Sequence, residues 1–300
     1  MVFRLGTRGS PLALVQAGLV RDALCAAHGW AVEQVEPVII RTTGDRVQDR
    51  ALAEIGGKAL WTKELDRALL AGEVDACVHS MKDVETVRPA AIAIAAMLPR
   101  ADVRDRLIGA DSIAALPDRA VVGTSSPRRR AQLLRLRPDL RIVLFRGNVE
   151  TRLARLAAGD ADATLLAAAG LDRLGRSDTG APIGCDVMLP APAQGAVGIE
   201  VRAGDERSHA VIAAIDDPAT SRCVAAERGL LAALRADCHS PVAALARVQD
   251  EQLRLDAELL DEDGTAHVTG SLVGDGEVGH ALAADLLARA PETVRRLFDG

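Results

Sequence analysis

The chain has 300 residues, which is enough for two or three domains rather than one ordinary core. Apolar residues make up 49% of the chain and the formal net charge is −6, so we expect a globular protein without the basic surface of a nucleic-acid-binding protein. Tyrosine is absent and there are three phenylalanines and two tryptophans, which argues against base-stacking platforms and aromatic cages.

The sequence has no pattern typical of export or of metal binding. The N-terminus has no long apolar run, and no window approaches the roughly 20 apolar residues of a membrane-spanning helix, so we expect a cytoplasmic protein with no membrane partner. Five scattered cysteines favour reduced thiols over a disulfide framework: Cys25, Cys77, Cys185, Cys223 and Cys238. No cysteine or histidine spacing is typical of a zinc site, so we expect no metal.

The first elements follow an α/β pattern. Residues 2–6 predict a strand. A helix is predicted from Pro11 to about His28, because Ser10 is a good N-cap and proline suits the first helical position. Arg8 comes just before this helix, beside the exposed backbone N–H groups at its start. Residues 35–40 predict a second strand.

Gly56–Lys58 resembles part of a phosphate-binding loop, but the full pattern is not met. Leu52 stands where the first glycine is required, and Ala59 replaces the serine or threonine that follows the lysine. We therefore interpret the stretch as a loop before a helix that runs from about Leu60 to Ala71.

Asp75–Val84 is the strongest candidate for a site. The stretch begins as a small apolar strand and ends in a base, a hydroxyl, an ammonium and a carboxylate: His79, Ser80, Lys82 and Asp83. Chemistry in α/β folds is commonly placed at the carboxyl end of such a strand. On the residues alone, a solvated surface pair of Lys82 and Asp83 remains the alternative. Residues 91–97 predict the next strand.

The second half of the chain repeats the first. Residues 98–119 have the character of a crossing between domains; a strand at 121–122 and a helix from Pro127 to about Leu136 follow. The turns Gly6–Pro11 and Gly123–Pro127 both carry Gly-Thr followed by Ser-Pro. Leu69–Ala76 and Leu156–Ala163 also match, which predicts two similar α/β domains.

Arginines cluster in this second half. Arg128–Arg130 occupy the first turn of the predicted helix, where the helix dipole disfavours cations, so a compensating anion is expected. The alternative is that these side chains are solvated. Further arginines follow the later strands: Arg146, Arg152, Arg155 and Arg173. Arginine binds carboxylates through paired hydrogen bonds, so convergence of these side chains predicts a polycarboxylate ligand.

The last third has a different character. Residues 190–196 contain two prolines and suit a hinge before a strand at 197–201. From about Asp216 the pattern predicts a small α+β domain. Its elements are a helix at 218–234, strands at 242–248, 252–260 and 265–273, and a helix at 278–290. Cys238 lies in the loop before the first of these strands, where an ordinary exposed thiol is the alternative to a functional one.

Together these motifs resemble the porphobilinogen deaminase (hydroxymethylbilane synthase) family over nearly the full length. The likeness rests on stretches that occur in the family's order: Thr7–Leu14, Gly56–Lys58, Val78–Val84, Gly123–Ser126, Arg146–Val149, Gln194–Glu200 and Cys238. Several ordered motifs of this length are highly specific in combination.

The resemblance implies two doubly wound α/β domains like type II periplasmic binding proteins, plus a small C-terminal α+β domain with a three-stranded antiparallel sheet. The expected boundaries are residues 1–97 with 196–215, residues 98–195, and residues 216–300, with the ligand cleft between the first two domains. The implied activity is that of a transferase of tetrapyrrole (haem, chlorophyll, cobalamin) biosynthesis. Four porphobilinogens are deaminated and joined into hydroxymethylbilane on a dipyrromethane cofactor, which is held by a thioether to Cys238. We also expect a monomer with no nucleic-acid partner.

The resemblance also assigns site residues. The family's catalytic aspartate matches Asp83, whose carboxylate can stabilise the azafulvene cation left by loss of ammonia and can move protons. Positions that bind carboxylates of the cofactor or substrate match seven cations: Arg8, Lys82, Arg128, Arg129, Arg146, Arg152 and Arg173. Ser10, Thr124 and Ser126 are expected to donate hydrogen bonds from their hydroxyls.

Some positions depart from the family pattern. They are Glu54 for a frequent lysine, Trp61 for phenylalanine, Glu85 for the proline after Asp-Val, and Ala236-Asp237 for a small pair before the cysteine. None of them removes a group that the chemistry needs. The rival hypothesis is a non-catalytic ligand-binding protein of the same two-domain architecture. A mass increase of two pyrrole units on the intact chain would favour the enzyme, and an unmodified mass would favour the binder.

Overall fold

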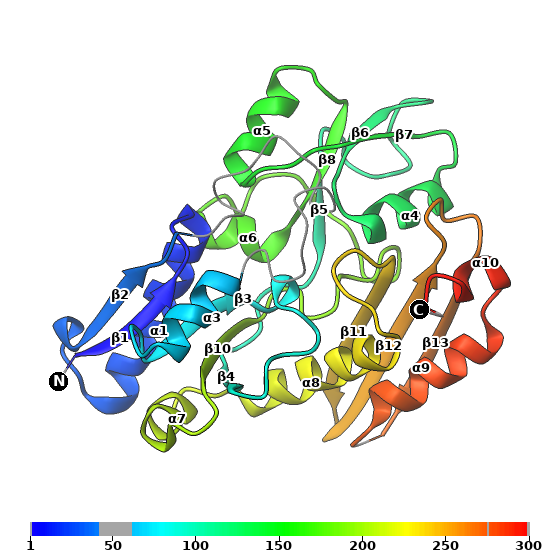
Figure 1. Ribbon diagram of the computed structural model, residues 1–300. Helices are drawn as coiled ribbons and strands as arrows, with labels where there is room; N and C mark the ends of the chain where they lie inside the picture. Colours follow the sequence, from blue (N-terminus) through cyan, green and yellow to red (C-terminus); the bar gives the residue numbers. More distant parts are fainter. Residues whose placement is uncertain (1, 42–61, 275, 299–300) are drawn as a thin grey trace. The chain divides into compact units, whose positions relative to one another are not determined.

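The computed structural model describes residues 2–41, 62–274 and 276–298 (Figure 1). The chain forms two compact units: Met1–Ala101 with Ala196–Ser221 (unit 1), and Asp102–Gly195 with Arg222–Gly300 (unit 2). The described residues contain no helix that is long and apolar enough to cross a membrane. Gly56–Lys58 and the departures Glu54 and Trp61 lie outside the described residues.

Unit 1 is built on a five-stranded sheet with the order β2-β1-β3-β10-β4. The strands are β1 (Phe3–Thr7), β2 (Val35–Ile39), β3 (Ala76–Ser80), β4 (Ile92–Met97) and β10 (Val197–Arg202). β1 pairs in parallel with β2 and β3, whereas β10 pairs antiparallel with β3 and β4. Because β1 and β3 are parallel neighbours, their carboxyl ends lie at the same edge of the sheet.

Helices α1 (Pro11–His28), α3 (Lys63–Leu70) and α7 (Glu206–Ala213) accompany this sheet (Figure 1). α1 begins as the sequence predicts: the Ser10 hydroxyl accepts a hydrogen bond from the Ala13 N–H at 3.4 Å, and a proline opens the helix. It ends at Gly29, which has the left-handed conformation (φ 66°) that favours glycine. Its apolar stripe, which includes Val20 and Leu24, packs against the strands.

The first sheet of unit 2 repeats this topology, with the order β7-β6-β8-β5-β9. Its strands are β5 (Asp105–Ile108), β6 (Val121–Gly123), β7 (Arg141–Val143), β8 (Ala163–Ala167) and β9 (Ala181–Pro182). In both sheets the three parallel strands are followed by one strand of opposite direction, β10 or β5, and then by a fifth strand that is antiparallel to it. The helices are α4 (Pro127–Leu136), α5 (Val149–Ala157) and α6 (Ala168–Arg173). The internal repeat predicted from the sequence is therefore present in the fold.

The C-terminal part forms an antiparallel three-stranded sheet with helices on it (Figure 1). Its elements are α8 (Pro218–Ala233), β11 (Val242–Gln249), β12 (Gln252–Leu260), β13 (His267–Val273), α9 (Val278–Arg289) and α10 (Glu292–Arg295). Leu230, Leu255 and Leu286, from three of these elements, are fully buried in one core. The predicted fold class, α/β with a small C-terminal antiparallel sheet, is confirmed. The three predicted domain boundaries remain a prediction.

Several elements differ from the sequence expectation. β3 continues through His79 and Ser80, so both residues belong to the strand rather than to the loop after it. The crossing at 98–119 contains β5, because tertiary pairing with β8 supplies hydrogen bonds that a four-residue strand cannot provide for itself. α6 follows β8 directly, which makes Arg173 the last residue of a helix rather than part of a loop.

Candidate active site

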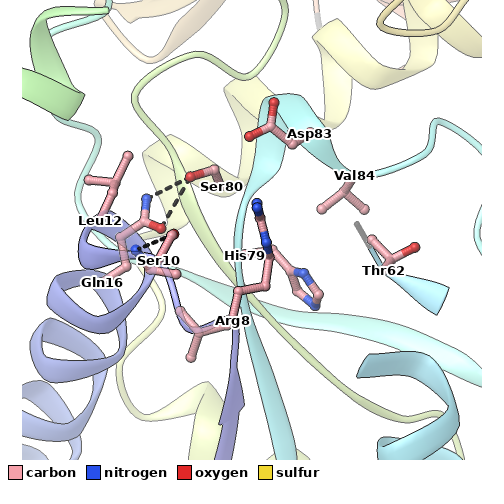
Figure 2. A pocket seen from close by; sticks show the side chains of 11 residues that line it. Arg8, Ser10, Leu12, Gln16, Thr62, His79, Ser80, Asp83 and Val84 are labelled. Carbon is pink, nitrogen blue, oxygen red and sulfur yellow. Dashed lines mark hydrogen bonds between the residues drawn. The ribbon is translucent and has the colours of Figure 1, made fainter. Parts of the chain in front are cut away.

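A pocket in unit 1 opens where β1 and β3 end and α1 begins (Figure 2). Its wall includes residues on both sides of the opening: Arg8, Ser10, Gln16, His79, Ser80 and Asp83. Three residues assigned from the sequence, Arg8, Ser10 and Asp83, are thus brought together. The turn after β1 supplies the first two, and the turn after β3 supplies the carboxylate.

Asp83 is the last residue of a 3-10 turn, Met81–Asp83, that follows β3 without a break. The Met81 N–H donates to the Ala196 carbonyl at 3.1 Å, and the Val84 N–H closes the turn on the Met81 carbonyl at 3.2 Å. Met81 and Val84 are buried, whereas Asp83 is exposed and faces the pocket opening (Figure 2). The half-buried Lys82 lies in the middle of the same turn.

Gln16 is a pocket residue that the sequence reasoning missed. Its side chain is buried, and it exchanges hydrogen bonds with the Ser80 hydroxyl at 2.7 and 3.1 Å (Figure 2). A signal for it existed, because Gln16 is a polar residue on the buried stripe of α1 between Ala13 and Val20. The pair joins α1 to β3 in the lining of the pocket.

Beside the pocket lies a buried polar cluster that we call the Arg88 network. Its members are Thr62, Asp66, His79, Glu85, Arg88 and Glu200. At its centre Glu200 on β10 is fully buried, with His79 Nε2 at 3.1 Å and Arg88 Nε at 2.7 Å. Burial alone would raise the pKa of Glu200, but pairing with His79 and Arg88 outweighs it and lowers the pKa to about 2.

The arginines at the start of α4 have an internal partner. Asp105 at the start of β5 accepts hydrogen bonds from Arg128 Nη1 at 2.7 Å and from Arg129 Nη2 at 2.7 Å, and all three side chains are buried. Burial would raise the pKa of Asp105, yet the two guanidinium groups hold it well below its usual range. The anion that the sequence analysis expected at this helix start is therefore a residue of the chain. A ligand role for Arg128 and Arg129 remains a prediction.

The two hydroxyls assigned in unit 2 both make hydrogen bonds within the turn between β6 and α4. The Ser126 hydroxyl caps α4 by accepting from the Arg129 N–H at 3.4 Å, and the Thr124 hydroxyl accepts from the Ser126 N–H at 3.2 Å. Thr124 is buried and Ser126 half-buried. The serine cap recurs at Ser10 before α1, whereas the Thr7 hydroxyl there donates to the Ala13 carbonyl at 3.1 Å.

Three more arginines assigned from the sequence lie in unit 2: Arg146, Arg152 and Arg173. Arg152 donates from Nε to the Gly147 carbonyl at 3.0 Å, and Arg173 donates from Nη2 to the Gly195 carbonyl at 2.7 Å. Burial lowers the pKa of Arg173. In the part of the chain that the structure describes, the buried Arg146 Nη1 has no hydrogen-bond partner. A buried donor left unpaired costs free energy, so an anionic ligand is the expected partner here.

Cys238 differs from the other cysteines in its exposure. Cys77 and Cys223 are buried and Cys25 and Cys185 half-buried, whereas Cys238 is exposed in the turn between α8 and β11. Asp237 shapes this turn, since its carboxylate accepts from the His239 N–H at 2.8 Å and its own N–H donates to the Ser240 hydroxyl at 3.2 Å. These hydrogen bonds explain why aspartate suits position 237, where the family pattern has a small residue.

Comparison with known proteins identifies the family. Residues 3–210 match the family model "Porphobilinogen deaminase, dipyromethane cofactor binding domain", and residues 221–288 match "Porphobilinogen deaminase, C-terminal domain". The chain belongs to the porphobilinogen deaminase family. The porphobilinogen deaminase of Sphingopyxis alaskensis is 60% identical over 302 residues, covering 98% of this chain and 96% of the relative. That of Paracoccus denitrificans is 51% identical over 286 residues, covering 94% and 91%.

Solved structures give a more distant likeness. The periplasmic sulfonate-binding protein SsuA of Methylobacillus flagellatus is 14% identical with a TM-score of 0.38, covering 71% of this chain and 66% of that protein. A ligand-binding component of a Staphylococcus aureus ABC-type import system is 13% identical with a TM-score of 0.40, covering 78% and 73%.

The residues present fit the dipyrromethane cofactor of the porphobilinogen deaminase family. Dipyrromethane carries several carboxylates, and in unit 2 the Arg146 side chain offers a buried nitrogen that no described group satisfies. Cys238 supplies an exposed sulfur for a thioether. The family departure Glu85 also has a structural reason, since its carboxylate accepts from the Thr62 hydroxyl at 2.8 Å and from Arg88 Nη1 at 2.6 Å.

Proposed function

We propose that the protein is a transferase that deaminates porphobilinogen and condenses four molecules head to tail on a covalently bound dipyrromethane primer, releasing hydroxymethylbilane and ammonia. The pocket that combines the Asp83 carboxylate with Arg8 and Ser80 carries the proposal, in a chain whose family match spans both of the family's domains. This activity belongs to tetrapyrrole biosynthesis. We further propose that the protein acts as a cytoplasmic monomer on a small-molecule substrate, without nucleic acid or membrane.

Asp83 would perform the central electrostatic and proton-transfer step. When ammonia leaves the aminomethyl group of porphobilinogen, the ring becomes a positively charged azafulvene. A carboxylate near the pyrrole nitrogen lowers the energy of that cation, and it can accept and return a proton as the next bond forms. Asp83 is suited to this task because it lies at a pocket opening on a turn whose flanking residues, Met81 and Val84, are buried.

Cations would orient the substrate while Asp83 acts. Porphobilinogen carries an acetate and a propionate, so each added unit brings two negative charges. Arg8 lines the pocket of unit 1, and Arg146, Arg152 and Arg173 lie in unit 2, where the buried Arg146 Nη1 has no hydrogen-bond partner among the described residues. A guanidinium group can donate two parallel hydrogen bonds to one carboxylate, which sets both its position and its orientation. The reacting carbon of the substrate is thereby held in place.

Cys238 would hold the primer. The bound dipyrromethane supplies a pyrrole carbon that is nucleophilic toward the incoming unit. An exposed thiol in a shaped turn is the appropriate anchor, because thiolates attack electrophilic carbon far more readily than hydroxyls do at neutral pH. The buried Cys77 and Cys223 are poorly accessible to such an electrophile, and burial raises the pKa of the Cys77 thiol.

Two measurements on the purified protein test this function. The intact mass should exceed the sequence mass by two pyrrole units, and incubation with porphobilinogen should release four ammonia molecules for each hydroxymethylbilane. An unmodified mass together with binding of porphobilinogen but no turnover would instead support a non-catalytic ligand-binding protein. Light scattering on the same sample tests the monomer.

A further inference from the structure

The placement of Asp83 depends on a segment that has little regular structure. The 3-10 turn that carries it has three residues, and no helix or strand follows until β4 begins at Ile92. A turn of this length does not hold a side chain rigidly by its own hydrogen bonds. The position of the carboxylate must therefore be fixed by what the flanking side chains contact.

The side chains on either side of Asp83 reach the same buried group. His79, four residues before Asp83, lies with Nε2 at 3.1 Å from Glu200. Arg88, five residues after Asp83, donates to Glu200 from Nε at 2.7 Å and from Nη2 at 2.9 Å. Glu200 is on β10, the strand that pairs with β3, so side chains before and after the turn both lie against one carboxylate on a fixed strand.

Arg88 has two further acidic partners. Its Nη2 donates to Asp66 on α3 at 2.5 Å, and its Nη1 donates to Glu85 at 2.6 Å. Glu85 is only two residues from Asp83. Among the described residues of the Arg88 network, Arg88 is the guanidinium that all three carboxylates share, and its side chain is only 8% exposed.

The charges make Arg88 necessary for this arrangement. Without the guanidinium, Asp66, Glu85 and Glu200 would face one another in a region of low dielectric, where repulsion between like charges is strong. Glu85 is the most exposed of the three, with 20% of its side chain accessible against 15% and 0%, so it is the one expected to turn outward. That movement would displace the backbone beside Asp83.

We propose that Arg88 is a positioning residue for Asp83: its fork of hydrogen bonds to Glu200, Asp66 and Glu85 fixes the Met81–Asp83 turn at the pocket. This inference rests on the proposed function for its catalytic consequence. A displacement of about 1 Å at a reacting group can lower a rate by about a hundredfold. Arg88 itself does not line the pocket, so substrate affinity should change much less than turnover.

The test uses variants that keep the net charge of the Arg88 network. Glu85→Gln/Arg88→Gln removes one cation and one carboxylate together, and Arg88→Lys keeps the cation but not the fork. Arg202→Gln is the matched control: Arg202 is a half-buried arginine on the same strand as Glu200, and it holds the carbonyls of Leu69 and Val74 at 2.8 Å. Its remaining hydrogen bond among the described residues goes to Asp205, which also lies outside the turn that carries Asp83.

We expect the double variant to lose about tenfold to a hundredfold in kcat with KM within about threefold. Arg88→Lys should retain an intermediate kcat, and Arg202→Gln should lower thermal stability without lowering kcat. The decisive measurement combines Glu85→Gln/Arg88→Gln with Asp83→Asn. If Arg88 acts through Asp83, the double change should lower the residual rate of Asp83→Asn by less than about threefold.

Hydrogen exchange supplies a readout that does not depend on activity. The Val84 amide closes the turn on Met81, so its exchange should quicken at least about tenfold in the Glu85→Gln/Arg88→Gln variant and stay unchanged in Arg202→Gln. Additive losses in kcat, a normal kcat in the folded variant, or unchanged Val84 exchange would each overturn the inference. If the wild-type protein does not turn over porphobilinogen, the proposed function fails, and Val84 exchange still decides whether Arg88 holds the turn.

Discussion

Replacing Asp105 with asparagine should destabilise unit 2 strongly. Asp105 receives four hydrogen bonds: from Arg128 Nη1 at 2.7 Å, from Arg129 Nη2 at 2.7 Å and Nε at 3.2 Å, and from Gln194 Nε2 at 2.9 Å. Asparagine keeps the shape of the side chain but removes its charge. The NH₂ group of asparagine is a hydrogen-bond donor, and it would face the N–H donors of the two arginines and of Gln194.

The magnitude follows from comparing two estimates. Hydrogen bonds to charged groups contribute about 1.5–3 kcal/mol each, which would sum to about 6–12 kcal/mol if the four were independent. They share one carboxylate, however, and the asparagine oxygen keeps part of them. Removing one partner of a buried ion pair usually costs about 3–5 kcal/mol, and we take that range for Asp105→Asn. For a unit of this size the midpoint of thermal unfolding should fall by about 6–20 °C.

Calorimetry at pH 7 measures the effect, with Asp139→Asn as the matched control. Asp139 also pairs with an arginine, accepting from Arg137 Nε at 2.7 Å and Nη2 at 2.8 Å, but the pair lies on the surface. Its replacement should shift the midpoint by no more than about 2 °C. A similarly small shift for Asp105→Asn would refute the argument that Arg128 and Arg129 need this carboxylate.

The pH dependence gives a second check on the same residue. Arg128 and Arg129 depress the pKa of Asp105 in the folded state, so its stabilisation is present above the ordinary carboxyl pKa of about 3.9 and is lost as pH falls toward the lower folded value. The difference in stability between wild type and Asp105→Asn should therefore be constant from about pH 5 to 8 and shrink below about pH 4. A difference that disappeared near pH 6 would point to another titrating group.

Three further predictions concern the chemistry. Asp83→Asn bearing its preassembled cofactor should lose at least about a hundredfold in turnover with an unchanged circular dichroism spectrum, and a rate within a fewfold of wild type would assign the step to another group. The intact mass of Cys238→Ser should show no pyrrole adduct. If Cys238→Ser carried the adduct and Cys77→Ser or Cys223→Ser did not, the cofactor would be attached to that other cysteine. Arg146→Leu should slow cofactor assembly or turnover by about tenfold or more, since it removes a charged hydrogen bond to a ligand carboxylate, and normal assembly and rate would contradict that role.

Local signals in the sequence predicted the helices that carry them. An N-cap serine followed by a first-turn proline determines both helix starts through contacts within three residues: Ser10 and Pro11 for α1, Ser126 and Pro127 for α4. β5 carries no such signal, because it has four residues and begins with a charged one. Its stability comes from β8, about sixty residues later in the chain, and that pairing cannot be inferred from local composition.

The candidate site also combines residues that a local motif predicts with partners that local sequence cannot predict. Asp83 stands in a local motif, and the resemblance assigned its role from the residues beside it. The partners that support the site come from distant positions: Arg88 binds Glu200 across 112 positions, and Gln16 binds Ser80 across 64. Asp105 was not singled out, although the sequence indicated that some anion must lie near Arg128 and Arg129. Charges that break a local rule predict that a partner exists, but not which residue it is.

The position of β10 also has a consequence for synthesis on the ribosome. β3 and β4 are neighbours of β10 and not of each other, yet β10 begins about a hundred residues after β4 ends. At translation rates of about 5–20 residues per second, this interval lasts about 5–20 s. During that time the nascent N-terminal sheet has an open gap where Val197–Arg202 will lie, and Arg88 has no Glu200 to bind. Completion of the N-terminal sheet must therefore wait until most of the following α/β domain has left the ribosome, so that domain has the first opportunity to fold.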